Sequence, residues 1–212
     1  MIAPEGWPFV LIPAFAGAAA WILGWPVAGG ILVAVGAFAL FFFRNPNRRC
    51  THDALTACSP ADGKVIKVGS APEEMVRRGL PLQVSVFMSV FDVHVNRASI
   101  DGSLVEYRYN PGRKISAFKE KASLENEQNL SVWEGPAGRI ALKQIAGLVA
   151  RRIVFDHGPG DAVQRSDRIG LIRYGSRLDV FLPADATILV EEGDRVRAGE
   201  SPVARFAGAV AS

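Results

Sequence analysis

Few side chains in this chain of 212 residues have the chemistry of a catalyst. The three histidines are His52, His94 and His157, and the two cysteines are Cys50 and Cys58. A histidine takes up and returns protons near neutral pH, and such a base can activate a serine hydroxyl as a nucleophile. The spacing of these five residues does not fit a zinc site, so we expect no metal centre. We interpret the cysteines as reduced thiols of a cytoplasmic protein.

Four short segments carry the polar residues that stand out most clearly. They are residues 59–65 (SPADGKV), 91–97 (FDVHVNR), 125–129 (ENEQN) and 170–180 (GLIRYGSRLDV). In this order the four segments resemble the short prokaryotic phosphatidylserine decarboxylases, which depend on a pyruvoyl group. Residues 146–153 (AGLVARRI) are similar to the same family. The resemblance extends over nearly all of the chain that follows its apolar N-terminus.

The resemblance implies that the chain is a proenzyme that cleaves itself between Gly175 and Ser176. In this chemistry the Ser176 hydroxyl attacks the preceding carbonyl and forms an ester by an N→O acyl shift. Loss of the Cα proton then expels the acyl group, and the serine becomes an N-terminal pyruvoyl group. Glycine offers a carbonyl with little steric cover and a backbone that tolerates a strained turn. We therefore expect a large fragment, residues 1–175, paired with a small fragment, residues 176–212.

Two further site residues follow from the same resemblance. His94 matches the family's Asp-x-His motif and is expected to act as the base in cleavage and as the acid in decarboxylation. Asp62 matches the family's acidic residue and is expected to orient His94 and to stabilise its cation. Some longer relatives carry a second histidine three positions after the first, where this chain has Arg97. One histidine would then serve both reactions.

The implied reaction converts phosphatidylserine to phosphatidylethanolamine, a step of phospholipid biosynthesis. The amine of the lipid would condense with the pyruvoyl ketone, and the prosthetic group would accept the electrons released with carbon dioxide. Another serine lipid, such as an archaeal ether analogue, presents the same head group and stays open as a substrate. The candidate residues for binding the lipid phosphate are Arg97, Arg113, Lys114, Lys119 and Lys121.

The main alternative is a non-enzymatic β module, either a lipoyl or biotinyl carrier or a membrane-anchored adaptor. A carrier needs a modifiable lysine at a hairpin tip, flanked by methionine or by aspartate and alanine, and the sequence has no such tripeptide. An adaptor would carry a long helical hairpin with heptads, which the sequence also lacks. A net charge of +3 is too small to indicate a nucleic-acid partner, but it suits a surface that faces anionic lipid.

The N-terminal region contains two apolar runs without charged residues, 8–23 and 27–43. Each is close to the minimum of about 17–20 residues for a membrane-spanning helix. Pro26 would break a continuous helix, so we predict a helical hairpin that crosses the bilayer twice or enters one leaflet. A buried hairpin of a soluble protein is the alternative. By the positive-inside rule, the arginines that follow place the catalytic domain on the cytoplasmic face of the cell (inner) membrane. These are Arg44, Arg48 and Arg49.

The rest of the chain has the pattern of an antiparallel β domain. Residues 83–88 and 177–182 alternate between apolar and polar side chains, and residues 141–145 do so more loosely. A helix is predicted over residues 116–129, which are rich in Lys, Glu, Ala and Gln.

A weak internal repeat adds to this picture. Residues 160–163 (GDAV) and 193–196 (GDRV) are two copies of one short pattern. The longer pattern at residues 193–200 (GDRVRAGE) is similar to the turn of lipoyl- and biotinyl-type barrel-sandwich domains, although Gly-Asp also occurs in ordinary hairpin turns. We predict a mainly β (α+β) protein. A membrane-associated hairpin and basic linker, residues 1–49, would precede a pseudo-duplicated, barrel-sandwich-like antiparallel β domain, residues 50–212. Whether the chain forms a homo-oligomer stays open.

Overall fold

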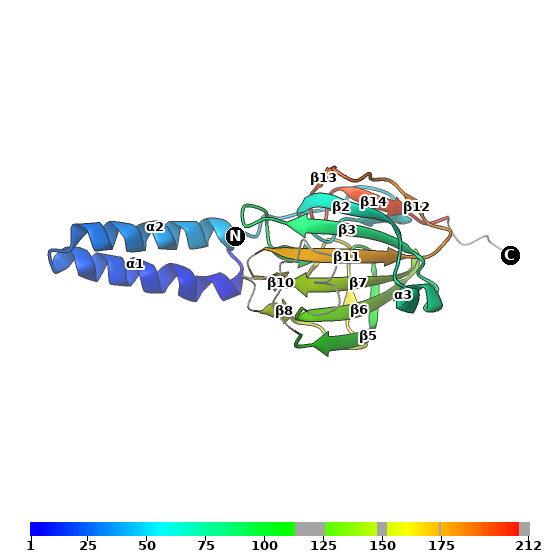
Figure 1. The fold of residues 1–212 in the computed structure, drawn as a ribbon, viewed down its shortest axis with the longest axis horizontal. Helices are drawn as coiled ribbons and strands as arrows, with labels where there is room; N and C mark the ends of the chain where they lie inside the picture. Colours follow the sequence, from blue (N-terminus) through cyan, green and yellow to red (C-terminus); the bar gives the residue numbers. More distant parts are fainter. Residues whose placement is uncertain (113–125, 148–151, 174, 208–212) are drawn as a thin grey trace. The chain divides into compact units, whose positions relative to one another are not determined.

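The computed structural model describes residues 1–112, 126–147, 152–173 and 175–207. The chain divides into two compact units, residues 1–47 and residues 48–212 (Figure 1). The first unit is helical, and the second is built almost entirely of β-strands. The prediction of a mainly β protein with an N-terminal helical pair is therefore confirmed.

The first unit is a helical hairpin preceded by one short 3-10 helix, η1 (Pro4–Gly6). Its two long helices are α1 (Trp7–Ile22) and α2 (Pro26–Phe42). Pro26 is the first residue of α2, so the two helices are not continuous. Proline is tolerated at this position because the first helical residue needs no backbone N–H donor. The helices approach closely at Gly29, where an added Cβ would lie 2.9 Å from the carbonyl oxygen of Gly17. Small residues thus line the helix–helix contact.

The outward side chains of this hairpin are large and apolar. Ile12 and Phe15 on α1 and Val27 on α2 are all more than two-thirds exposed. Among the described residues, the continuous helical stretch Pro4–Ile22 is long and apolar enough to cross a membrane, whereas Pro26–Phe42 is apolar but shorter. Length and composition thus make the first stretch a candidate membrane span.

The second unit centres on an antiparallel sheet that has eight strands in the described part of the chain. Two three-stranded sheets and one short helix, α3 (Glu73–Arg77), accompany it. In spatial order the large sheet comprises β13 (Arg195–Val196), β2 (Gly63–Ser70), β3 (Leu82–Met88), β11 (Ser176–Leu182), β7 (Gly138–Ala146), β6 (Gln128–Gly135), β5 (Gly102–Asn110) and β9 (Ala162–Val163). One small sheet consists, in spatial order, of β1 (Thr56–Cys58), β14 (Pro202–Arg205) and β12 (Thr187–Ile188). The other consists of β4 (Val95–Arg97), β10 (Arg168–Ile172) and β8 (Ile153–Phe155).

Along the central strands of the large sheet, successive side chains point alternately to its inner face and its outer face. The inner face carries the main core, whose residues include Val84, Val86, Leu178, Val180 and Leu142, all fully buried. The outer face is partly covered by α3, which adds a smaller apolar cluster. That cluster contains Met75, Leu80, Leu130, Val132, Ala141 and Phe181. The predicted strands at 83–88, 141–145 and 177–182 are confirmed and lie next to one another.

The internal repeat has a structural counterpart. Asp161 Oδ2 accepts a hydrogen bond from Gly158 N, and Asp194 Oδ2 accepts the equivalent bond from Glu191 N. The short strands that follow these turns, β9 and β13, are the two outermost strands in the order of the large sheet. Six residues after each turn glycine the backbone again has positive φ, at Ser166 and Gly199. The two similar segments therefore form the two edges of the large sheet.

The predicted helix at 116–129 is wrong where the structure describes it. Residues 113–125 lie outside the described residues, but Gln128 and Asn129 begin β6, paired with Ile145 and Gln144 of β7. Both side chains are buried in the sheet. The favourable pairing with β7 outweighs the local helix propensity of this polar segment.

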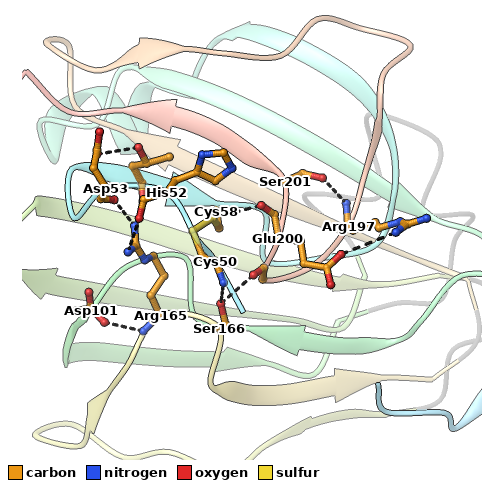
Figure 2. Close-up of a disulfide and its surroundings, with 12 residues drawn as sticks. Cys50, His52, Asp53, Cys58, Asp101, Arg165, Ser166, Arg197, Glu200 and Ser201 are labelled. Carbon is orange, nitrogen blue, oxygen red and sulfur yellow. Dashed lines mark hydrogen bonds and ion pairs between the residues drawn. A yellow bond between two sulfur atoms is a disulfide. The ribbon is translucent and has the colours of Figure 1, made fainter. Parts of the chain in front are cut away.

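The interpretation of the cysteines as reduced thiols is also wrong, because Cys50 and Cys58 form a disulfide (Figure 2). The segment before β1 folds back, and Cys50 N donates a hydrogen bond to Ser166 Oγ at 2.9 Å. This brings the two cysteine Cα atoms to 6.4 Å, within the range that a disulfide spans. Two cysteines eight positions apart carry no pairing signal in the sequence, so only the folded segment reveals the bridge.

Candidate active site

Ser176 is the first residue of β11, and the sheet register fixes its neighbours. It lies opposite Met88 of β3 on one side and Ala146 of β7 on the other. Its side chain is fully buried on the inner face, in phase with Leu178. The Ser176 hydroxyl donates to the thioether sulfur of Met88 at 3.5 Å, and sulfur is a weak acceptor.

Gly175 gives the preceding residue an unusual backbone. Its φ is +57°, in the left-handed region that favours glycine. An added Cβ would meet no atom within 4 Å, so the requirement for glycine here is conformational and not a matter of space. The peptide predicted to be cleaved therefore begins in a turn that leads directly into β11.

His94 lies just before β4 and is fully buried. Its Nδ1 is 3.0 Å from the carbonyl oxygen of Asp92. That contact favours the tautomer with the proton on Nδ1, which gives Nε2 the lone pair of a base. The Asp92 carboxylate is used elsewhere, accepting from Ser89 N and pairing with Arg195. The aspartate of the Asp-x-His motif thus shapes the turn, while its backbone orients the histidine.

Two neighbouring connections bring His94 and Ser176 to the same region of the domain. Residues 89–94 join β3 to β4, and residues 173–175 join β10 to β11. Because β11 pairs with β3 while β10 pairs with β4, both connections pass between the same two sheets. Ile172 N donates to the carbonyl oxygen of His94 at 3.3 Å. The candidate base and the candidate nucleophile therefore belong to adjacent sheet-to-sheet crossings.

Asp62 is held in the loop between β1 and β2. Its Oδ1 accepts from Ala198 N at 2.7 Å, and its Oδ2 lies 3.2 Å from Nη2 of Arg48. The same loop is fixed to β4, since Arg97 N donates to the carbonyl oxygen of Pro60 at 2.9 Å. A direct contact between Asp62 and His94, implied by the family resemblance, stays a prediction.

Sequence reasoning missed a buried polar chain beside Ser176. Gln144 Nε2 donates to Asn96 Oδ1 at 2.7 Å, and Asn96 Nδ2 lies 3.7 Å from the Met88 sulfur that also receives the Ser176 hydroxyl. Asn126 Nδ2 donates to the carbonyl oxygen of Ala146, the β7 partner of Ser176, at 2.7 Å. The sequence signal that could have revealed this chain is a polar residue at a strand position whose side chain faces the core. Gln144 is such a residue, because it lies two positions after the core residue Leu142 on the same face of β7.

Arg97 is poorly placed to meet a lipid phosphate. Its side chain is buried, and Nη1 donates to the carbonyl oxygen of Ser166 at 2.7 Å. Burial, and then the nearby charge of Arg48, lowers the pKa of Arg97. The structure therefore gives Arg97 a role inside the domain. The other phosphate candidates lie outside the described residues: Arg113, Lys114, Lys119 and Lys121.

The outer face of the large sheet carries a separate hollow. It has a volume of about 130 Å³ and lies beside α3. Burial lowers the pKa of Lys143 at this hollow, and the carboxylate of Asp179 opposes the shift. Since Ser176 points to the inner face, the hollow does not belong to the site of Ser176. Its lining residues are Glu74, Met75, Arg108, Asn110, Gln128, Leu130 and Lys143.

Comparison with known proteins shows the family to which the chain belongs. The family model described as phosphatidylserine decarboxylase matches residues 35–204. The phosphatidylserine decarboxylase proenzyme of Geotalea uraniireducens (strain Rf4) is 44% identical over 201 residues, 94% of each chain. The proenzyme of Magnetococcus marinus (strain ATCC BAA-1437 / JCM 17883 / MC-1) is 40% identical over 215 residues, 98% of this chain and 96% of the relative. That of Syntrophus aciditrophicus (strain SB) is 41% identical over 213 residues, 97% of each.

Proposed function

Because this chain belongs to the phosphatidylserine decarboxylase family, we propose that it matures by cleaving its own Gly175–Ser176 bond and then converts phosphatidylserine to phosphatidylethanolamine. The observation that carries the proposal is the setting of Ser176. It is a fully buried serine that follows a glycine with φ of +57°. A serine there has its neighbouring carbonyl presented by a turn and is shielded from bulk water.

Cleavage needs no group from outside the chain apart from water. The Ser176 Oγ bonds to the carbonyl carbon of Gly175 as the peptide C–N bond breaks, and the hydroxyl proton passes through the base to the freed amine. Loss of the Ser176 Cα proton then breaks the Cβ–Oγ bond and releases the Gly175 carboxylate. Addition of water and loss of ammonia leave a ketone at the new N-terminus. Once formed, this pyruvoyl group supplies an electron sink for decarboxylation.

His94 is the proposed base and acid. The Asp92 carbonyl holds its Nδ1, so Nε2 is the nitrogen that would accept the Ser176 proton and later protonate the product. His157 is a weaker candidate because both of its ring nitrogens face partners, Nε2 at 3.1 Å from the carbonyl oxygen of Arg168 and Nδ1 at 3.8 Å from Asp161 Oδ2. His52 is exposed before β1. Asp62 is proposed to stabilise the His94 cation.

The fit between these residues and a pyruvoyl group rests on the inner face of β11. Ser176 has a small, fully buried side chain whose contact is a thioether, and no charged side chain pairs with it among the described contacts. A ketone at this position would take no more room than the serine it replaces. Asn96 and Gln144 lie within the same polar chain and would supply amide groups near it.

We further propose that the N-terminal hairpin attaches the protein to the inner membrane, with the β domain on the cytoplasmic face, although a disulfide such as Cys50–Cys58 is rare in that compartment. The apolar stretch Pro4–Ile22 and the outward side chains of Ile12 and Phe15 support the attachment. Arg44, Arg48 and Arg49 support the orientation. A lipid substrate held in the same bilayer gives such an anchor a purpose.

An intact mass and a single substitution test maturation. Purified protein should consist of residues 1–175 and residues 176–212, the second resisting Edman degradation because a pyruvoyl terminus has no amine. Ser176→Ala should remain one uncut chain without activity, since no hydroxyl is left to attack. Ser103→Ala, a serine of β5 in the same sheet, is the matched control and should mature normally. An uncut wild-type chain that still decarboxylates the lipid would contradict the proposal.

A further inference from the structure

The Asp62 carboxylate is fixed at both of its oxygen atoms. A backbone N–H holds Oδ1, and the Arg48 guanidinium holds Oδ2. Only about a tenth of each side chain of the pair is exposed, at 11% for Arg48 and 12% for Asp62. Ion pairs exposed to solvent contribute little to stability. A pair as well buried as this one strongly restricts the orientation of its carboxylate.

Arg48 is itself held in a defined orientation. Its Nη1 donates to Glu200 Oε2 at 2.7 Å while its Nη2 faces Asp62. A planar guanidinium that bridges two carboxylates has little freedom to rotate. The nearby Arg97, whose pKa is lowered first by burial and then by Arg48, adds a second positive charge to the group. Arg48 therefore belongs to a compact charged cluster and not to an open surface.

The backbone around Arg48 is fastened to the same part of the domain. Two residues later, Cys50 is bonded to Cys58 at the end of β1, and Cys50 N donates to Ser166 Oγ (Figure 2). Ser166 Oγ in turn donates to the carbonyl oxygen of Gly199 at 2.8 Å. The Cys58 sulfur lies 3.6 Å from the carbonyl oxygen of Glu200, the residue whose carboxylate holds Arg48. The disulfide thus helps to place Arg48 between Glu200 and Asp62.

We infer that Arg48 is a positioning residue for maturation, which sets the orientation of the Asp62 carboxylate and acts on the reaction through it. The inference rests on the proposed role of Asp62. Without Arg48, Oδ2 loses its cationic partner and the carboxylate can turn about its Cβ–Cγ bond. A displacement of about 1 Å in such a group can slow a reaction on the order of 10²-fold.

Self-cleavage of the newly made full-length chain gives the direct test. In a cell-free translation followed on gels, Arg48→Gln should cleave about 10- to 100-fold more slowly than wild type. Arg48→Lys should recover part of the rate, because it restores the charge without the forked geometry. The matched control is Arg197→Gln, which removes an exposed arginine 3.9 Å from Glu200 and should cleave at the wild-type rate.

A double-mutant cycle separates positioning from a general loss of structure. If Arg48 acts through Asp62, adding Arg48→Gln to Asp62→Asn should change the cleavage rate less than about twofold. A purely structural role would slow both backgrounds equally. Wild-type cleavage by Arg48→Gln, equal slowing in both backgrounds, or wild-type cleavage by Asp62→Asn would each overturn the inference. Failure of the proposed maturation itself would appear separately, as cleavage of Ser176→Ala.

Discussion

The Ser176 hydroxyl donates to a thioether although it lies in a sheet rich in stronger acceptors. A carboxylate or a backbone carbonyl would hold the hydroxyl hydrogen firmly in one direction, whereas the Met88 sulfur holds it weakly. The hydroxyl can then turn toward a base at small cost. Complete burial keeps bulk water from acting as a competing nucleophile. These two properties favour attack on the neighbouring peptide carbonyl.

Replacing His94 tests the proposed proton carrier. His94→Ala should slow self-cleavage by at least about 10²-fold, because the serine would lose its base. His157→Ala is the control, since His157 packs on Trp133 and Phe155 and should affect stability more than the rate of maturation. The rate is read on gels from freshly translated chains.

The outcome for His94→Ala also shows whether His94 carries protons in self-cleavage, in decarboxylation or in both reactions. If the variant matures and decarboxylates like wild type, the proton carrier lies elsewhere. Normal maturation with lost decarboxylation would restrict His94 to the second reaction, and the base for cleavage would need another residue.

The sequence identified Ser176, Gly175 and His94 because each stands in a short motif with a recognisable order. Asn96 stands in the same motif as His94 but was assigned no role, and Gln144 carries no comparable signal because it is one polar residue in a strand. They meet only because the fold brings β4 of one sheet next to β7 of another, although the two strands are far apart in sequence. The partners of Asp62 were missed for the same reason, as Arg48 and Ala198 lie on either side of it at long range.

At the level of elements, alternation predicted which residues form strands but not which strands become neighbours. Alternation reports the face on which a side chain lies, and pairing depends on contacts that are distant in sequence. β11 inserts between β3 and β7, although β10 precedes it in the chain. That insertion creates the two adjacent crossings that carry His94 and Ser176. The helix predicted over 116–129 shows the converse, because local composition suggested a helix where residues 128–129 join a strand.

The disulfide yields a prediction about one segment of the fold. Replacing both Cys50 and Cys58 by serine should lower the free energy of unfolding by about 2–3 kcal/mol, the chain-entropy value for a loop of this length. It should also slow self-cleavage, because the segment that carries Arg48 is released from the Ser166 turn. Unfolding and cleavage are measured with and without dithiothreitol.

The reductant supplies the matched control. Dithiothreitol should move the wild type toward the double variant and leave the double variant unchanged. If oxidised wild-type protein, denatured without reductant, is labelled at both cysteines by a thiol reagent, the bridge does not form. Equal unfolding midpoints for the wild type and the double variant would show that the bridge contributes nothing to stability.

The whole molecule combines an apolar hairpin without a charged residue between positions 6 and 43 with a charged β domain. The division into units at residues 47 and 48 falls immediately before Arg48. The residue inferred to set the Asp62 carboxylate is therefore the first residue of the β unit and lies within the basic linker that follows the hairpin. The proposed membrane attachment and the inferred preparation of the site therefore involve adjacent parts of the sequence, which composition alone revealed only as an arginine-rich linker.

Charged substitutions on the hairpin test its role in the intact protein. Ile12→Glu combined with Phe15→Glu should release the protein from membranes, because each acidic side chain costs roughly 2.5–3.5 kcal/mol near the centre of a bilayer. Val105→Glu combined with Leu189→Glu adds the same charge at exposed apolar positions of the β unit and should leave sedimentation unchanged. After maturation is confirmed for both variants, activity is compared on bilayer phosphatidylserine and on short-chain lipid dispersed in detergent. The hairpin variant should lose more activity on the bilayer than on the dispersed lipid. Equal losses on the two substrates would mean that the hairpin supports the folded domain and not access to the membrane.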